Sequence, residues 1–70
     1  MQEYISNNVN TLRQEKGDTQ EELAFAVGVS RQTIIAIEKG NYTPSVLLAI
    51  KIAVYFKTSV EKVFILNKKR

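Results

Sequence analysis

Five side chains between residues 31 and 39 have the types and spacing needed to contact the edges of DNA bases. Four of them recur on one face of a helix, with an arginine at the edge of that face: Gln32, Ile35, Ala36, Lys39 and Arg31. An α-helix fits the DNA major groove, where arginine donates two hydrogen bonds to guanine, glutamine pairs with adenine and small apolar groups touch the thymine methyl. The chemistry that this face predicts is therefore non-covalent contact with base pairs.

A second helix must position this face, and the preceding residues predict one. Thr19 and Glu22 have the spacing of a capping box, in which both side chains bond free N–H groups at a helix start. The helix is therefore expected to start at Gln20. Gly28 most easily takes the left-handed conformation that closes a helix, so the helix is expected to end near Val27.

The turn and the second helix follow directly. Val29 is apolar in the middle of the turn, where a solvent-facing loop would favour a polar residue, so the turn is expected to be buried. Ser30 can cap a helix that runs to Gly40, with Ile34 and Ile37 pointing inward. These residues predict two short helices joined at a fixed angle.

Three further helices are expected to complete an all-α, five-helix bundle, over residues 6–16, 46–56 and 60–64. Gly17 ends the first, and Ser45 and Ser59 can cap the other two. Residues 46–56 are apolar almost all round, so this helix is expected to be central to the fold or shared with another chain. The expected inward positions are Ile5, Val9 and Leu12, then Leu48, Ala49, Ile52 and Phe56, and finally Val60 and Val63.

The two ends of the chain leave two alternatives open. Tyr4 and Ile5 near the start and Ile65 and Leu66 near the end are apolar. They could pair as a short β-ribbon, although a lone two-stranded ribbon is marginal unless it lies against something. Otherwise the first helix starts earlier.

Composition excludes several classes of function. Seventy residues without cysteine or histidine suit one small domain, 1–70, and exclude disulfides, thiolate or imidazole metal sites and a histidine base. The remaining titratable groups show no convergent pair at a recognisable spacing, so no enzyme, metal or cofactor is expected. The longest apolar stretch, 46–56, contains Lys51 and falls well short of the ~20 residues of a membrane span. No signal peptide is visible, and a cytoplasmic location is expected by default.

The positive charge is concentrated at the end of the chain. The formal net charge is +3, and Lys68, Lys69 and Arg70 together carry three positive charges, so the body is close to neutral. Placement therefore matters more than net charge. The bases expected to lie toward DNA are Arg31, Lys39 and Lys57. The acids expected to lie elsewhere are Glu21, Glu22 and Glu61.

The segments TQEELA, VGVSRQTI and IEKGNYTPS resemble the Cro/repressor-type (XRE-like) helix-turn-helix family, most closely its short stand-alone members. The resemblance extends from about Val9 to Phe64. It implies a lambda-repressor-like DNA-binding bundle, with the motif over residues 20–39 and double-stranded DNA as the partner.

This resemblance also implies individual contacts. Gln20 would meet a DNA phosphate, and Arg31 and Gln32 would enter the groove at the start of their helix. Thr33 could bond a phosphate or reinforce the Ser30 cap, and Ile35 could rest on a thymine methyl or pack against Tyr42. The full set of expected DNA contacts is Gln20, Ser30, Arg31, Gln32, Thr33, Ile35, Ala36, Lys39, Asn41 and Tyr42. Glu38 is expected to be structural, paired with Lys51 or Arg13.

The sequence also departs from the family pattern. Asp18 stands where the family usually places an apolar residue, so the hydrophobic staple is missing. Phe25 is apolar at an outward position of its helix. Further exposed apolar groups predict a dimer interface formed by Leu47, Val54, Tyr55, Phe64, Ile65 and Leu66.

The sequence thus predicts a sequence-specific transcriptional regulator. We expect a repressor that binds a pseudo-palindromic operator as a homodimer, with two recognition helices roughly 34 Å apart. An antitoxin-type regulator that acts with a protein partner is the alternative. A helical interaction module that does not bind DNA is a further one.

Overall fold

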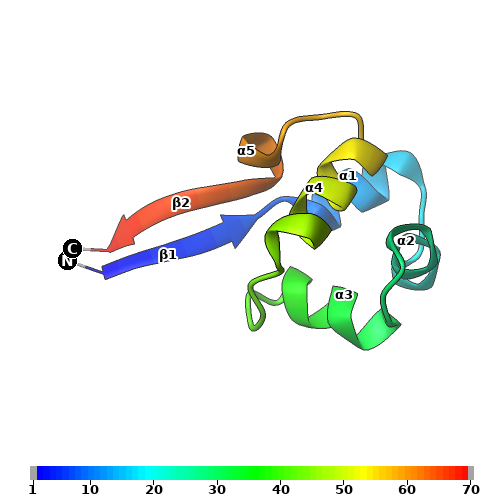
Figure 1. The fold of residues 1–70 in the computed structure, drawn as a ribbon, viewed down its shortest axis with the longest axis horizontal. Helices are drawn as coiled ribbons and strands as arrows, with labels where there is room; N and C mark the ends of the chain where they lie inside the picture. Colours follow the sequence, from blue (N-terminus) through cyan, green and yellow to red (C-terminus); the bar gives the residue numbers. More distant parts are fainter. Residues whose placement is uncertain (1, 70) are drawn as a thin grey trace.

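The computed structural model describes residues 2–69 and shows five helices and one antiparallel β-ribbon in this part of the chain (Figure 1). The elements in chain order are β1 Gln2–Asn7, α1 Val9–Lys16, α2 Gln20–Val27, α3 Arg31–Glu38, α4 Val46–Tyr55, α5 Val60–Val63 and β2 Phe64–Lys69. No helix within residues 2–69 has the length and apolar character needed to cross a membrane.

The predicted boundaries of α2 and the start of α3 are confirmed. Thr19 Oγ1 accepts the Glu22 N–H at 3.0 Å, and Glu22 Oε1 accepts the Thr19 N–H at 2.7 Å, which completes the capping box. Gly28 closes α2 with a φ of 77°. Ser30 Oγ then accepts the Thr33 N–H at 3.3 Å and caps α3. Local hydrogen bonds therefore fix both sides of the turn.

The core lies where α1 to α5 meet. Its buried residues are Val9, Leu23, Ala24, Val27, Ile34, Ile37, Leu48, Ile52, Ala53 and Val63. Val29 packs against this core and is partly buried, as its apolar character predicted. One predicted inward position is wrong, because Ala53 is buried in α4 and Ala49 is only partly so. Phe56 and Val60 pack against the core from its edge.

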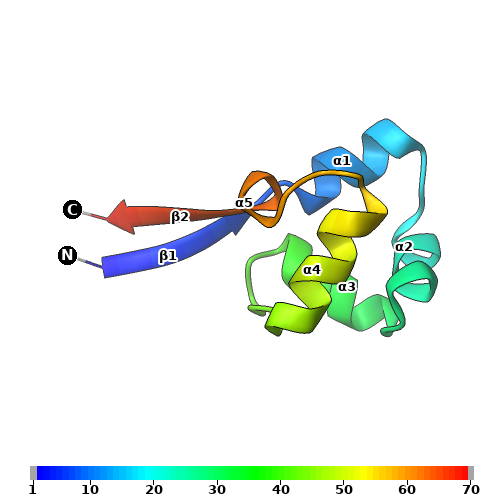
Figure 2. The same ribbon diagram turned by 45° about the horizontal axis from the view of Figure 1, so that its top comes forward.

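The ribbon is present, and the alternative of an earlier start for the first helix is wrong. Ser6 and Asn7 belong to β1, so α1 begins at Val9 and Ile5 is not part of its apolar stripe. Residues 2–7 pair with residues 64–69, with Ile5 opposite Leu66 and Asn7 opposite Phe64. Figures 1 and 2 show the ribbon projecting from the helical body, with both described ends at its far tip.

The last helix is shorter than predicted. α5 ends at Val63, and Phe64 already has extended backbone and opens β2. Ser59 precedes α5 but makes no side-chain capping hydrogen bond, contrary to expectation. The short helix therefore serves to turn the chain from α4 into the ribbon.

Candidate nucleic-acid interface

α3 presents a polar face to solvent and an apolar face to the core. Ile34 and Ile37 are fully buried, which fixes the rotation of the helix about its axis. Arg31 and Gln32 in the first turn are exposed, and so is Lys39 at the C-terminal end. Three of the expected DNA-facing side chains are thus accessible to solvent at the two ends of α3.

The middle of this face is less open than its ends. Ile35 and Ala36 are partly buried, so only part of each side chain is available to a ligand. Thr33 is partly buried as well, and its hydroxyl shares a 3.1 Å hydrogen bond with the hydroxyl of Ser30. Thr33 therefore does reinforce the Ser30 cap, which was one of its two expected roles.

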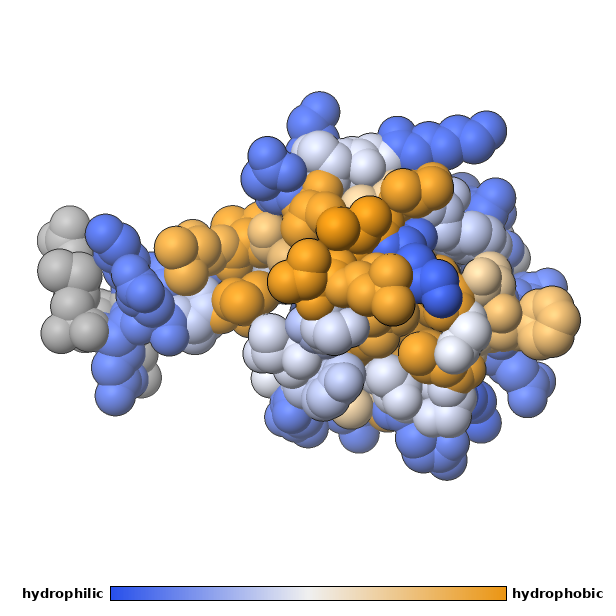
Figure 3. Space-filling model, in the orientation of Figure 1, coloured by the Kyte–Doolittle hydropathy of each residue, from blue (hydrophilic) through white to orange (hydrophobic). Residues whose placement is uncertain are grey.

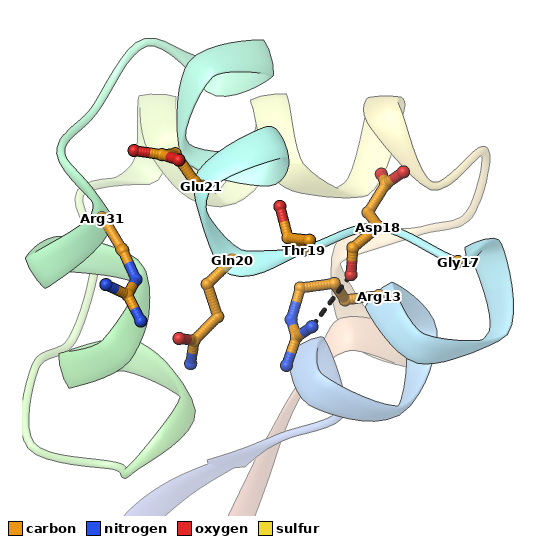
Figure 4. A pocket seen from close by; sticks show the side chains of 7 residues that line it. All are labelled: Arg13, Gly17, Asp18, Thr19, Gln20, Glu21 and Arg31. Atoms are coloured by element: carbon orange, nitrogen blue, oxygen red, sulfur yellow. Dashed lines mark hydrogen bonds between the residues drawn. The ribbon is translucent and has the colours of Figure 1, made fainter.

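A hollow of about 550 Å³ separates the start of α2 from the start of α3. Its lining residues are Arg13, Gly17, Asp18, Thr19, Gln20, Glu21 and Arg31. Figure 4 shows Gln20 between the guanidinium groups of Arg31 and Arg13, so donors from three elements face this space. Glu21 lines the same hollow as Arg31, so the expected separation of this acid from the bases is wrong.

Glu38, in the last turn of α3, anchors that end of the helix to α1 and α2. Its carboxylate accepts hydrogen bonds from Arg13 Nε at 2.8 Å and Nη2 at 3.3 Å. Asn10 Nδ2 and Gln20 Nε2 donate to the same carboxylate at 3.0 and 3.1 Å. The predicted pairing with Arg13 is confirmed, and the structural role of Glu38 with it.

The charge state of Glu38 reflects these contacts. Burial alone would raise the pKa of Glu38, since its side chain is only 6% exposed. The hydrogen bonds from Arg13, Asn10 and Gln20 outweigh that effect and hold the pKa below its ordinary value. Glu38 is therefore ionised at neutral pH, and Gln20 is held in place by a charged acceptor.

Asp18 makes polar contacts in place of the missing hydrophobic staple. Its carboxylate accepts a hydrogen bond from the hydroxyl of Tyr55, at the end of α4, which raises the pKa of Tyr55. Its backbone carbonyl accepts Arg13 Nη1 at 2.9 Å. Lys16 Nζ lies 5.1 Å from the centroid of the Tyr55 ring. The turn between α1 and α2 is thus tied to α4.

The loop after α3 continues the exposed surface. Gly40 has a φ of 79°, and the N–H of Asn41 donates to Ala36 O at 2.9 Å, which closes the helix. The side chains of Asn41 and Tyr42 are exposed beside this end of α3. Lys57 lines a different hollow, with Leu12 and residues at the end of α1, and not the hollow lined by Gln20 and Arg31.

α4 has a broad apolar surface that faces solvent. Leu47 and Val54 are exposed, as predicted, and Val46 and Ile50 are exposed on the same helix, which sequence reasoning missed. Figure 3 shows apolar residues gathered over α4 and continuing to the base of the ribbon, where Ile65 and Leu66 are exposed. Tyr55 and Phe64 instead pack partly against the core of their own chain.

Sequence reasoning also missed Asn7. The side-chain amide of this ribbon residue donates to the carbonyl of Ile37 in α3 at 2.8 Å. Its oxygen accepts the N–H of Val9 at 3.1 Å. Asn7 and Asn8 fall inside the helix predicted over residues 6–16, and nothing in the local pattern indicates a bond to a helix 30 residues away.

Known proteins are similar to this chain over the five helices. The model of the helix-turn-helix family matches residues 9–63. The uncharacterised HTH-type transcriptional regulator YgzD of Bacillus subtilis is 50% identical over 64 residues, covering 91% of this chain and 97% of that protein. An uncharacterised HTH-type transcriptional regulator of Methanocaldococcus jannaschii is 64% identical over 47 residues, covering 67% of this chain and 71% of that protein.

A solved structure agrees with this comparison. The restriction-modification controller protein C.AhdI from Aeromonas hydrophila superposes with a TM-score of 0.73 at 29% identity. The match covers 79% of this chain and 83% of that one. The similarity thus extends well beyond α2 and α3 to most of the bundle.

Proposed function

Because the chain belongs to the helix-turn-helix family of DNA-binding transcriptional regulators, we propose that it is a repressor that recognises a pseudo-palindromic operator as a homodimer. The expected family and fold class are confirmed by these matches. The role of repressor, the operator symmetry and the dimer are the proposal. Its proposed target is double-stranded DNA, and we place the protein in the cytoplasm on that basis.

The observation that carries the proposal is the exposed face of α3. Arg31 and Gln32 are exposed at the helix start, whereas Ile34 and Ile37 hold the opposite face in the core. A helix held in this way can enter the major groove with its N-terminal residues on base edges. Arg31 and Gln32 are the proposed base-reading pair, with Ile35 and Ala36 as apolar neighbours.

The proposed phosphate contacts surround this pair. Gln20 at the start of α2 lies on one side, and Lys39, Asn41 and Tyr42 lie at the other end of α3. Ser30 and Thr33 complete the set at the capped start of α3. Contacts to phosphate set the register of a protein on DNA and leave sequence selection to the base-facing residues.

The proposed dimer uses the apolar surface of α4 and the ribbon. One recognition helix touches too few base pairs for useful selectivity, and a two-fold dimer doubles the site. Its exposed members are Leu47, Val54, Ile65 and Leu66, whereas Tyr55 and Phe64 are partly buried against the core and contribute only the exposed part of their side chains. In a two-fold interface this surface would pair with its own copy, so that apolar residues would face apolar residues.

A protein-partnered regulator is the second candidate, and Phe25 favours it. This side chain is 89% exposed on α2, away from any role described above. An apolar hollow of about 300 Å³ lies between α2 and α4, lined by Ala26, Val27, Ile50, Lys51, Val54 and Tyr55, the last two of which also belong to the proposed dimer surface. An antitoxin-type protein would use such a surface for its partner.

The decisive experiment is titration of the purified protein against the DNA upstream of its own gene and against unrelated DNA, at several salt concentrations. The wild type is compared with Gln32→Ala, and Gln14→Ala on α1 is the matched control. We expect Gln32→Ala to weaken binding to the upstream DNA only, by roughly 10-fold or more, since a bidentate base contact contributes about 1–3 kcal/mol.

The other outcomes contradict the proposal in different ways. Equal and steeply salt-dependent binding to both DNAs would show phosphate contact without base recognition. No binding to either DNA would favour the protein-partnered candidate. Loss of selectivity in Gln14→Ala as well as Gln32→Ala would mean that the effect of Gln32→Ala is not specific to base contact by α3.

A further inference from the structure

We propose that Asn7 is a positioning residue for DNA recognition, which holds the C-terminal turn of α3 at the distance and angle set by the base of the ribbon. The inference rests on the proposed recognition of DNA by α3. Asn7 itself is at the end of β1 and makes no proposed contact with DNA.

The first step is the bond that Asn7 makes to α3. The last four carbonyls of a helix have no partner within the helix. At the end of α3, the Ile37 carbonyl accepts the Gly40 N–H at 2.9 Å and the Asn7 side-chain amide at 2.8 Å. Asn7 thus reaches α3 from a part of the chain 30 residues away.

The second step is that Asn7 has little freedom of its own. Its side-chain oxygen accepts the Val9 N–H at 3.1 Å, and its backbone is paired with Phe64 at the root of the ribbon. The next residue continues the tie, since the N–H of Asn8 donates to Val63 O at 2.9 Å. Asn7 therefore joins β1, α1 and α3 through one amide.

The third step concerns how α3 is held at each end. Ser30 caps its start. Its last turn is held through contacts to two of its own residues, Ile37 and Glu38. Glu38 is bound by Arg13 of α1, and the carbonyl of Ile37 is bound by Asn7. The helical body thus holds this turn through Glu38 and the buried Ile37 side chain, and the ribbon adds the bond from Asn7. Losing the ribbon anchor loosens the end of α3 that carries Lys39.

This position matters more for base contacts than for phosphate contacts. Hydrogen bonds to base edges depend on the docking of the whole helix, whereas non-specific phosphate binding is electrostatic and tolerates small shifts. Because α3 docks as one rigid helix, a shift of its last turn also tilts Arg31 and Gln32 at its start. A positioning role for Asn7 therefore predicts a loss of selectivity that is larger than the loss of non-specific affinity.

The test uses the asparagine next door as its matched control. Asn7→Asp keeps an acceptor for the Val9 N–H but removes the donor to Ile37, and it adds one negative charge. Asn8→Asp adds the same charge one residue away, and the Asn8 amide donates to Lys62 O of α5, not to α3. Asn7→Ala and Asn8→Ala form a second pair without added charge, which decides the matter if the Asp variants do not fold.

Two measurements are made on each variant, at a temperature well below its unfolding transition. Protein concentrations are chosen so that all variants have the same fraction of dimer. The first is the ratio of affinities for a duplex selected by the wild type from a random library and for unrelated DNA. We expect this ratio to fall about three- to tenfold more in the Asn7 variants than in the Asn8 variants, the size of one hydrogen bond.

The second measurement is amide hydrogen exchange in the absence of DNA. The amides of Gly40 and Asn41 close the end of α3, and we expect them to exchange faster in the Asn7 variants only. The Thr33 amide at the capped start is the internal control and should not change.

The results separate this inference from the proposed function. If the wild type selects no duplex, the proposed function fails, and the exchange rates still decide whether Asn7 holds α3. The inference is overturned if Asn7 and Asn8 variants show the same affinity ratio, or if the Gly40 and Asn41 amides exchange at wild-type rates.

Discussion

Replacing Glu38 with alanine is expected to destabilise the protein by about 3 kcal/mol. The change removes the acceptor of four hydrogen bonds, from Arg13, Asn10 and Gln20. Breaking a buried ion pair by removing one partner costs about 3–5 kcal/mol, because the other charge is left without compensation. The lower end of that range applies here, since the Arg13 side chain is 12% exposed and can recover some hydration.

A loss of about 3 kcal/mol is a large fraction of the free energy of unfolding. A domain of 70 residues has a free energy of unfolding of about 4–10 kcal/mol. Glu38→Ala is therefore expected to lower Tm by more than about 10 °C. The contact joins α1, α2 and α3, so the loss should appear as one cooperative transition at a lower urea concentration.

The assay is urea unfolding followed by circular dichroism, at one protein concentration for all variants. Glu61→Ala, which removes an exposed carboxylate on α5, is the control. Arg13→Ala and the double variant complete a cycle, which should give a coupling energy of at least about 1 kcal/mol. A Glu38→Ala protein within 1 kcal/mol of Glu61→Ala would refute the reasoning.

Three more predictions follow from single features. The folded pKa of Glu38 lies below the ordinary 4.5. Its contribution to the free energy of unfolding is therefore complete above pH 4.5 and is lost as the pH falls through the folded pKa. In urea unfolding, the stability of Glu38→Gln should fall less on acidification than that of the wild type. Gly28→Ala should cost about 1–2 kcal/mol from backbone strain alone, since φ is +77° and the nearest atom to the new methyl group is Lys51 Nζ at 3.7 Å; an unchanged urea midpoint would contradict this. Val54→Glu should give a monomer in sedimentation equilibrium, with unchanged helical content. The control Thr11→Glu, on α1, should remain a dimer. A wild type that is monomeric in the same experiment would count against the dimer.

The motif could be predicted from the sequence because its signals are local. The capping box of Thr19 and Glu22 and the cap at Ser30 involve residues three positions apart, so the order of side chains specifies the geometry directly. Gly28 likewise closes α2 through its own backbone conformation. The exposed face of α3 then follows from the buried positions of Ile34 and Ile37.

The ribbon could only be offered as an alternative, because its pairs are distant in sequence. Ile5 precedes Val9 by four residues, which also fits a helix, and only the pairing of Ile5 with Leu66 decides between the two. α4 raised a different difficulty. Its residues are apolar all round, so periodicity could not show that Ala53 rather than Ala49 faces the core.

Side-chain contacts between helices were the least predictable part of the site. The sequence offered two partners for Glu38, and the fold selected Arg13. It did not indicate that Asn10 and Gln20 donate to the same carboxylate, or that Asp18 accepts from Tyr55. Such contacts depend on the angles between helices, which no short pattern specifies.

The pairing of β1 with β2 has a consequence for the order of folding. The helices from α1 to α4 can form and pack through contacts between neighbours in sequence, which is fast. The ribbon must instead close a loop of nearly the whole chain, since Gln2 pairs with Lys69. During synthesis β1 has no partner until the ribosome has made residues 64–69. The pairing that fixes the backbone of Asn7 is therefore completed late, after α3 has formed.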